Sequence, residues 1–338
     1  MKKKMLFLAG GVVLFLLAPL AFRPSQLMML NEIMIFALYA MSYNLLLGYG
    51  GLLSFGHSVF LGFGAYITGV LLVHYPEFPF LALILISTLG TLLVGFTLGL
   101  LLLRQTGASF ALLTMAIGGM FSTIALKWSD VTGGDDGICI FRPDINLFLL
   151  QLNTTDVTVF YYISMFLIGL ATLCCWHFTR TSMGQTVLLI RENENRMQFL
   201  GYSAPISRLM LFTVSASLAG LAGSLYMLFI GTVAYDVISI PMSATALLIT
   251  FIGGIGSFFG PWLGAAFYIY VQDLLSGITT RWPFFMGIIF ILMVMFQRQG
   301  LAGLLVRCLE GFRWLKDRRC QAKDDPAQKE AQYELQVS

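Results

Sequence analysis

Charged residues are scarce in this sequence. Aspartate, glutamate, lysine and arginine make up only 11% of the 338 residues, whereas hydrophobic residues make up 58%. A soluble domain typically carries about 25% charged and about 45–50% apolar residues. The chain is therefore an integral membrane protein. Its apolar character continues over nearly the whole length and leaves no room for a separate soluble domain beyond a C-terminal tail.

Cysteine and histidine are also few, and their spacing suits neither a metal site nor a disulfide framework. Five cysteines and three histidines are dispersed along the chain. No cysteine pair has metal-ligand spacing with histidines nearby. By the topology given below only Cys139 faces outward, so we expect no disulfide and no bound metal.

Motifs that would supply chemical energy or catalysis are missing from the sequence. There is no G-x-x-x-x-G-K-[ST] loop to cradle nucleotide phosphates and no H-E-x-x-H helix. No Ser/His/Asp arrangement is found, which argues against a membrane-embedded enzyme. No span carries the paired carboxylates that proton-coupled pumps often use. The chain either conducts passively or is driven by another subunit.

Apolar windows are what the sequence does contain, and ten are long enough to cross the ~30 Å core of a bilayer. They cover residues 5–22, 27–47, 55–73, 80–103, 107–126, 158–178, 208–230, 241–255, 259–275 and 282–297. The first window is longer than the ~7–15 residue core of a signal peptide and lacks a clean cleavage site, so we expect a retained span. The predicted fold class is all-α, a polytopic membrane protein of about ten transmembrane helices.

Lysine and arginine are distributed unequally between the two sides that these windows define. With the N-terminus in the cytoplasm, only four of the 20 basic residues fall outside: Arg23, Lys127, Arg142 and Arg281. The positive-inside rule therefore predicts that both termini are cytoplasmic. Residues 1–305 form the predicted transmembrane domain. Residues 306–338 form a tail that begins as a basic amphipathic helix on anionic lipid and ends as a disordered segment.

Two glycine-rich stretches, residues 48–56 and 253–261, share a Gly-Gly-x-x-Ser-Phe core, so that Ser54 corresponds to Ser257. Interrupted hydrophobic segments at corresponding positions of two halves indicate a transporter repeat, with re-entrant or broken segments on the substrate route. Close helix packing at small residues explains the same glycines without any ligand. Both interpretations stay open.

Polar side chains inside the spans are functional candidates because their burial in lipid is costly. Five of them lie in or near the glycine-rich stretches and are predicted to face the substrate pathway: Asn44, Ser54, His57, Thr250 and Ser257. His57, beside the first glycine run, is the best single candidate. A hydrogen bond between helices is the commoner fate of a lone intramembrane asparagine, serine or threonine.

Residues 182–208 form the only long polar interval between two long apolar regions, and the topology places them in the cytoplasm. Ser182 followed by Gln185 predicts a capping box at the start of a helix. Gly201 predicts the end of this helix.

The predicted helix covers about residues 184–200 and is amphipathic, with Leu189, Met197 and Leu200 near one face. A short amphipathic helix between membrane spans can dock into a groove of another protein. A solvated interfacial loop is the alternative.

The largest outer loop runs from about residue 128 to 157. Its first part is dense in aspartate and glycine, which predicts tight turns, and no full calcium loop follows.

Several motifs, in the same order along the chain, give a resemblance to a known family. They are Asn44–His57, Gly62–Tyr66, Thr132–Gly137, Gly201–Ser203, Ser217–Tyr226 and Ile252–Gly264. With them the chain resembles the permease subunits of branched-chain amino acid ABC importers, and in particular the longer, M-type subunit. The resemblance covers nearly all of residues 27–305.

The resemblance implies half of a pore in a bacterial plasma (inner) membrane, driven by partners. These would be a second permease, two ATPase subunits that use ATP and Mg²⁺, and an extracytoplasmic binding protein. This chain itself would bind no cofactor, and nucleic acid is not among the partners. The cytoplasmic interval matches the family's coupling segment, with Arg191, Glu192, Asn193, Glu194, Arg196 and Gly201 as the candidates for ATPase coupling. The outer residues Thr132, Gly133, Gly134, Asp135, Asp136 and Gly137 would help to receive the binding protein.

Branched-chain or other hydrophobic amino acids are the expected substrates. A permease of the same family for urea or short amides is the first alternative, and nothing in the sequence separates these substrates. A self-contained secondary transporter or channel is the second. The missing carboxylate pair and the predicted docking helix count against it.

Overall fold

The computed structural model describes residues 22–142, 145–147, 150–152, 156–296 and 300–304, together with residue 19. The described helices are α2 (Pro24–Asn44), η1 (Leu45–Tyr49, a π-helix), α3 (Ser58–His74), α4 (Phe80–Leu102), α5 (Gly107–Lys127), α6 (Ser129–Thr132), α7 (Val157–Arg180), α8 (Ser182–Glu192), α9 (Glu194–Phe199), α10 (Ala204–Ile230), η2 (Tyr235–Ile238, a 3₁₀ helix), α11 (Ile240–Gly253), α12 (Gly260–Ile278) and α13 (Trp282–Phe296). The short strands are β1 (Ile138–Cys139), β2 (Ile145–Leu147), β3 (Leu150–Leu152) and β4 (Thr232–Val233).

The predicted helical membrane architecture is confirmed in its broad form. Five stretches are long and apolar enough to cross a membrane: α2 with η1, α4, α5, α7 and α10. Three shorter apolar helices, α3, α11 and α13, add to them. Every predicted window after the first contains a helix. The first window, residues 5–22, lies almost wholly outside the described residues, as does the predicted tail, residues 306–338.

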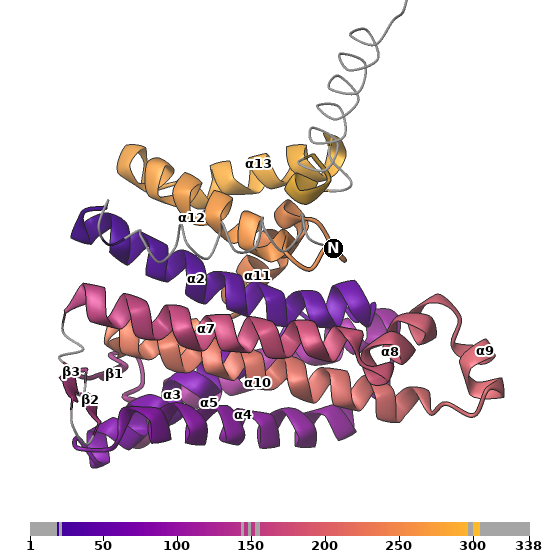
Figure 1. Cartoon of the computed structure of the whole chain (residues 1–338), viewed down its shortest axis with the longest axis horizontal. Helices are drawn as coiled ribbons and strands as arrows, with labels where there is room; N and C mark the ends of the chain where they lie inside the picture. Colours follow the sequence, from indigo (N-terminus) through magenta and orange to yellow (C-terminus); the bar gives the residue numbers. More distant parts are fainter. Residues whose placement is uncertain are drawn as a thin grey trace, which may run out of the picture.

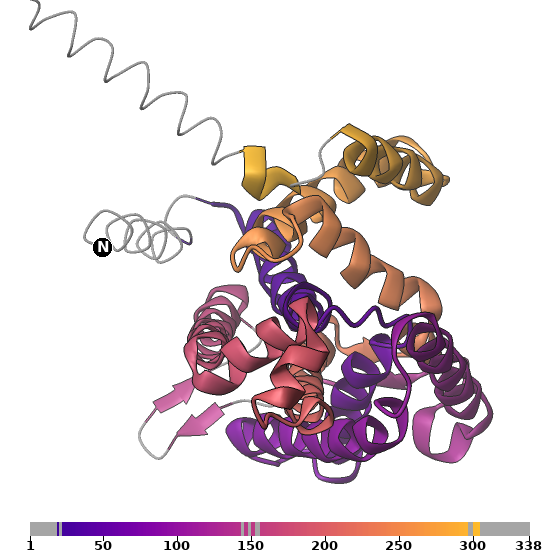
Figure 2. The same cartoon turned by 90° about the vertical axis from the view of Figure 1, so that its right-hand side faces the viewer.

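Helix α2 is the centre of the molecule. It lies between α11, α12 and α13 on one side and the remaining long helices on the other (Figure 1). Figure 2 views the same arrangement from the end that carries α8 and α9. Every residue from Ile33 to Asn44 is buried. A helix that is apolar around its whole circumference, as this one is, has no face to offer water and belongs inside a bundle.

Close packing of α3 against α10 forms the largest contact between two helices on the other side of α2. Glycines make this approach possible. A Cβ added at Gly64 would overlap the carbonyl oxygen of Gly220, and one at Gly223 would overlap the carbonyl oxygen of Leu61. Membrane helices gain stability by packing their backbones closely at small residues.

The outer helices present leucine, isoleucine and phenylalanine outward. Only 28% of the most apolar stretch is buried in each of α4, α5 and α7. Residues such as Leu93, Leu112 and Phe166 are more than half exposed in the isolated chain. In a bilayer these side chains contact lipid or a neighbouring subunit, because either contact removes their apolar surface from water.

Two small antiparallel sheets accompany the predicted all-α architecture. Ile138 and Cys139 of β1 pair with Val233 and Thr232 of β4, and β2 pairs with β3. The segments are too short to show a strand pattern in the sequence. The first sheet ties the loop after α5 to the connection between α10 and α11.

The strands and the pair α8 and α9 lie at opposite ends of the bundle (Figure 1). This is the arrangement expected when the loop at residues 128–157 and the interval at residues 182–208 lie on opposite sides of a membrane.

Candidate functional site

The capping box predicted for Ser182 and Gln185 is wrong, although a helix does start at Ser182. The residue that caps α8 is Thr181, whose side-chain oxygen accepts a hydrogen bond from the backbone N–H of Gly184. The side chain of Gln185 instead donates to the carbonyl of Thr179, at 2.8 Å. Helix α7 runs to Arg180, so only Thr181 separates the two helices and Ser182 already lies in the first turn of α8.

The single helix predicted for residues 184–200 is also wrong, because the chain breaks at Asn193. This residue is extended, with φ −155° and ψ 97°, and its side chain accepts a hydrogen bond from the N–H of Arg196 at 3.1 Å. An asparagine at this position caps a helix well because its side chain replaces a missing backbone acceptor. The interval is therefore two helices, α8 and α9, at an angle to one another (Figure 1).

The helix end predicted at Gly201 is confirmed, since α9 ends at Phe199. Gly201 has φ +85°, and its N–H donates to the carbonyl of Gln198 while the N–H of Tyr202 donates to that of Met197. These two bonds form a Schellman motif, which glycine adopts at little cost.

The predicted apolar face of the interval is wrong for two of its three members. Met197 is buried, together with Ile190 and Ala204. Leu189 and Leu200 are exposed at 47% and 65%, and Phe199 is exposed at 91%. The bend at Asn193 changes the direction of the helix, so a periodicity that continues through it assigns the wrong face. We call Leu189, Phe199 and Leu200 the apolar patch.

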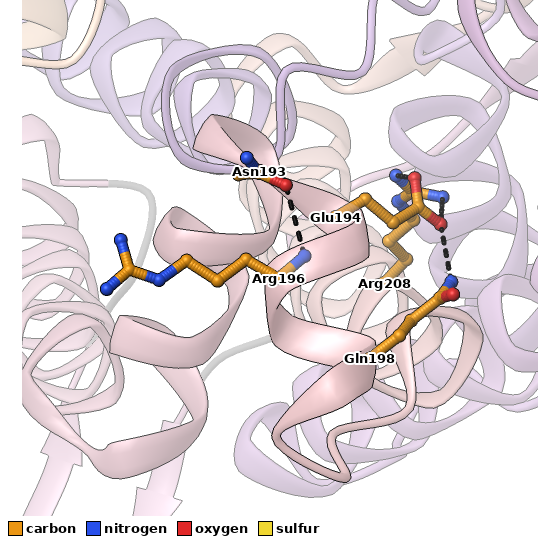
Figure 3. A network of polar contacts seen from close by, with 5 residues as sticks. All are labelled: Asn193, Glu194, Arg196, Gln198 and Arg208. Carbon is orange, nitrogen blue, oxygen red and sulfur yellow. Dashed lines mark hydrogen bonds and ion pairs between the residues drawn. The ribbon is translucent and has the colours of Figure 1, made fainter.

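An ion pair holds α9 against the bundle. Arg208 at the start of α10 lies 2.6 Å from a carboxylate oxygen of Glu194 and bonds both oxygens, as Figure 3 shows. The side chain of Arg196 extends in the opposite direction in the same view. Arg196 and Glu192 are both exposed. Among the predicted coupling residues, Glu194 therefore positions α9, while Arg196 and Glu192 are exposed at the surface.

Arg191 has a different environment, because its guanidinium donates to the carbonyl oxygen of Gly48 in η1. Its aliphatic part also packs beside Gly51, where an added Cβ would lie 3.1 Å from Arg191 Cγ. The polar interval at residues 182–208 thus contacts the first glycine-rich stretch.

All five residues predicted for the substrate pathway gather around the last two turns of α2. Asn44 donates to the carbonyl of Ser257 at 3.0 Å, and Thr250 donates to the carbonyl of Ala40 at 3.1 Å. The carbonyl of Ser54 accepts from the Tyr43 hydroxyl at 3.0 Å. Four of the five are buried, with Ser257 partly exposed. Residues from both halves of the chain therefore meet at one helix end.

His57 is fully buried and lies 2.8 Å from the hydroxyl of Ser42 through Nε2. The Ser42 hydroxyl already donates its proton to the carbonyl of Tyr39, at 2.6 Å. The neutral tautomer with the proton on Nε2 fits this pair of contacts. The ring stacks on that of Tyr39, with centroids 5.6 Å apart. His57 does not face water in this conformation, and its place on the pathway stays a prediction.

Three serines that sequence reasoning missed complete this polar core. Ser58 donates to the carbonyls of Ile238 and Ser239, Ser243 donates to Ser58 at 2.7 Å, and Ser215 donates to the carbonyl of Ser42 at 2.6 Å. Ser58 and Ser243 join the starts of α3 and α11, and Ser215 joins α10 to α2. Their small hydroxyls inside apolar windows were the available signal, but serine is common in membrane helices and its partner cannot be read from spacing.

The predicted outer turn is confirmed as a set of tight turns. Gly133, Gly134 and Gly137 all have positive φ, and the Thr132 hydroxyl donates to the carbonyl of Trp128 at 2.7 Å. Asp135 and Asp136 are exposed at the tip. The turn packs closely on the backbone of β4, since a Cβ added at Gly137 would overlap the carbonyl oxygen of Val233. The loop therefore presents two carboxylates on a fixed backbone.

A family described as the permease component of the branched-chain amino acid transport system matches residues 25–296. The chain belongs to this family. Two relatives are each 28% identical over 319 residues, covering 88% of this chain and 75% of their own length. Both are named high-affinity branched-chain amino acid transport system permease protein LivM, one from Escherichia coli (strain K12) and the other from Salmonella typhimurium (strain LT2). No solved structure matches the chain.

Membership of the family identifies the chain as a multi-pass membrane permease component and not as an enzyme. A permease component of an ABC system requires no cofactor of its own, because nucleotide is bound elsewhere in the system. This agrees with the missing phosphate-binding loop in the sequence.

Proposed function

We propose that this chain forms one half of the translocation pathway of an ATP-driven importer for branched-chain or other hydrophobic amino acids. Its partners are a second, homologous permease, two ATPase subunits and an extracytoplasmic binding protein. The observation that carries the proposal is the pair α8 and α9, which stands at one end of the bundle with an exposed apolar patch beside free charged side chains. An exposed aromatic group rimmed by polar residues is typical of a protein interface.

The proposed topology has ten membrane spans with both termini in the cytoplasm of a bacterial inner membrane. The distribution of lysine and arginine supports it. The glycine-rich stretches are proposed to be re-entrant. In support, residues 50–57 run back beside α2, since Tyr43 bonds the carbonyl of Ser54 and Ser42 contacts His57.

The substrate is proposed from the relatives, whose names specify branched-chain amino acids. The binding protein is expected to provide most of the selectivity, while the permease moves what is delivered. Alternating access follows when the ATPases close and the two permeases rock against each other. Urea and short amides are the substrates to test against amino acids.

Co-expression of this chain with a second permease and ATPase subunits tests the proposal directly. We expect one complex to purify and to hydrolyse ATP faster in proteoliposomes when a binding protein loaded with leucine is added. Binding proteins loaded with urea, or empty, are the comparisons. Uptake by the chain alone without ATP would contradict the proposal and favour a secondary transporter.

The outer turn offers a second test of the same assembly. Asp135→Asn combined with Asp136→Asn removes two exposed charges at its tip and leaves the glycine turns unchanged. Charges at the rim of an interface chiefly affect association rate. We expect the concentration of binding protein that half-stimulates ATP hydrolysis to rise several-fold, and more at low salt.

The matched control for the outer turn is Asp156→Asn. Asp156 is also exposed and precedes α7 without a side-chain capping bond. The proposed docking role predicts that this variant behaves as the wild type. If both variants raise the half-stimulating concentration of binding protein equally, the effect is due to net charge, and the turn is not the docking site.

A further inference from the structure

Arg191 of the polar interval contacts the first glycine-rich stretch. The side chain lies near the end of α8, and its guanidinium bonds the carbonyl of Gly48. That carbonyl belongs to η1, where the chain winds with π-helical instead of α-helical bonds. π-helical turns inside helices occur frequently at functional sites because they leave the local ladder irregular.

Space around Gly48 is closed on its inner side. A Cβ at this position would overlap Oδ1 of Asn44 and would lie 3.0 Å from the backbone nitrogen of Gly256. Gly48 is therefore in contact with both the end of α2 and the second glycine-rich stretch. A displacement of its backbone has to move at least one of these neighbours, because there is no gap to absorb it.

Asn44 connects the two stretches through both ends of its amide. Nδ2 donates to the carbonyl of Ser257 at 3.0 Å, and Oδ1 accepts from the N–H of Gly256 at 3.2 Å. Asn44 is 1% exposed, so water does not compete for these bonds. The two bonds fix the loop between α11 and α12 to the end of α2.

We propose that Arg191, Gly48 and Asn44 form a mechanical linkage that carries the movement of α8 to the loop between α11 and α12. The inference rests on the proposed function and deepens it. Arg191 acts as a positioning residue that transmits force inward, while Glu192 and Arg196 face the partner. The linkage joins both glycine-rich stretches to one cytoplasmic helix and thereby couples the two halves of the chain.

A structural role for Arg191 in holding the fold is separable from this coupling role. Arg191 is an exposed residue, and its guanidinium donates to one carbonyl, that of Gly48. A single exposed polar contact contributes little to stability. Replacing it therefore leaves the permease folded and assembled, and a change in coupling can be measured alone.

The experiment compares wild type, Arg191→Gln and Arg191→Lys in the complete complex in proteoliposomes. ATP hydrolysis and leucine uptake are measured on the same preparation, with leucine-loaded binding protein outside. For Arg191→Gln we expect unchanged co-purification of the ATPases, hydrolysis within twofold of wild type, and about tenfold less uptake per ATP hydrolysed. Arg191→Lys keeps a charged donor, so it is expected to keep most of the wild-type uptake per ATP hydrolysed.

Arg104→Gln is the matched control for charge. Arg104 lies between α4 and α5, on the same side of the membrane in the proposed topology, and is exposed; its side chain forms no hydrogen bond or ion pair within the described residues. Its uptake per ATP should equal that of wild type. Equal ratios in Arg191→Gln and Arg104→Gln would overturn the linkage. A wild-type chain that recruits no ATPase would instead overturn the proposed function, so the two failures are distinguishable.

Asn44→Asp provides the second, independent variant. It has nearly the same shape and keeps the acceptor for the N–H of Gly256 but loses the donor to Ser257. We expect a loss of coupling similar to that of Arg191→Gln, with the double variant no worse than the poorer single one. Additive losses would mean that the two residues act separately and would contradict a shared linkage.

Discussion

Replacing Gly223 by alanine is expected to remove most of the folded protein from a membrane preparation. The added Cβ would overlap the carbonyl oxygen of Leu61 and approach the nitrogen of Ala65 to 3.0 Å. Both neighbours are backbone atoms, so no flexible side chain can yield and α3 must move away from α10. Overpacking of this kind costs ~3 kcal/mol. Thermal unfolding in detergent should show a midpoint lowered by roughly 5 °C or more.

Gly277→Ala is the control for the glycine prediction. Gly277 lies in α12, and nothing stands within 4 Å of a Cβ built there. Alanine is also the better helix former by about 1 kcal/mol, so this variant should be as stable as wild type or slightly more so. Equal yields and midpoints for the two variants would show that the α3–α10 contact does not require a glycine.

The positions of the long helices could be predicted because they follow from hydrophobicity alone. A helix such as α4 has 23 apolar or small residues in succession, and the bilayer requires about 20. The contact that organises these helices around α2 could not be predicted. All membrane helices are apolar, so composition does not reveal which of them is surrounded by protein. The short pairing of β1 with β4 depends on two segments 93 residues apart, which no local pattern connects.

The candidate site was predicted in its residue types but not in its connections. Asn44, His57 and Thr250 were recognisable because polar groups are rare in the spans. Their partners are backbone carbonyls and hydroxyls of other helices, which carry no sequence signal. Arg191 and Glu194 looked equivalent as charges in one polar interval. Only the structure shows that one bonds η1 and the other bonds Arg208.

The break at Asn193 explains why the prediction of the apolar face was wrong and why Phe199 and Leu200 are exposed. Helical periodicity holds only along a continuous axis, and the extended backbone of Asn193 ends one axis and begins the next. The side chains of Phe199 and Leu200 are left outside as a result. An aromatic side chain buries about 150–250 Å² when it enters a partner's groove. Under the proposed function, the apolar patch is therefore the expected anchor of an ATPase subunit.

Phe199→Ala is expected to weaken the binding of the ATPase to this permease at least tenfold. Truncation of a central aromatic anchor costs about 2 kcal/mol or more of binding free energy, which corresponds to roughly 30-fold in affinity. Stability should not change, because Phe199 is 91% exposed and contributes little to the core. The affinity is measured by titrating purified ATPase onto the permease pair in nanodiscs.

Phe141→Ala separates this docking effect from a general effect of surface aromatic groups. Phe141 is 99% exposed and lies two residues after β1 (Ile138–Cys139), a strand at the opposite end of the bundle from α9 (Figure 1). Its loss should leave the affinity for the ATPase unchanged. If Phe199→Ala also binds with wild-type affinity, the exposed ring contacts something other than the ATPase. If only Phe199→Ala binds weakly, the apolar patch is the docking site, and Arg191 lies on the inner side of the same interval, where it can pass the movement of the ATPase to η1.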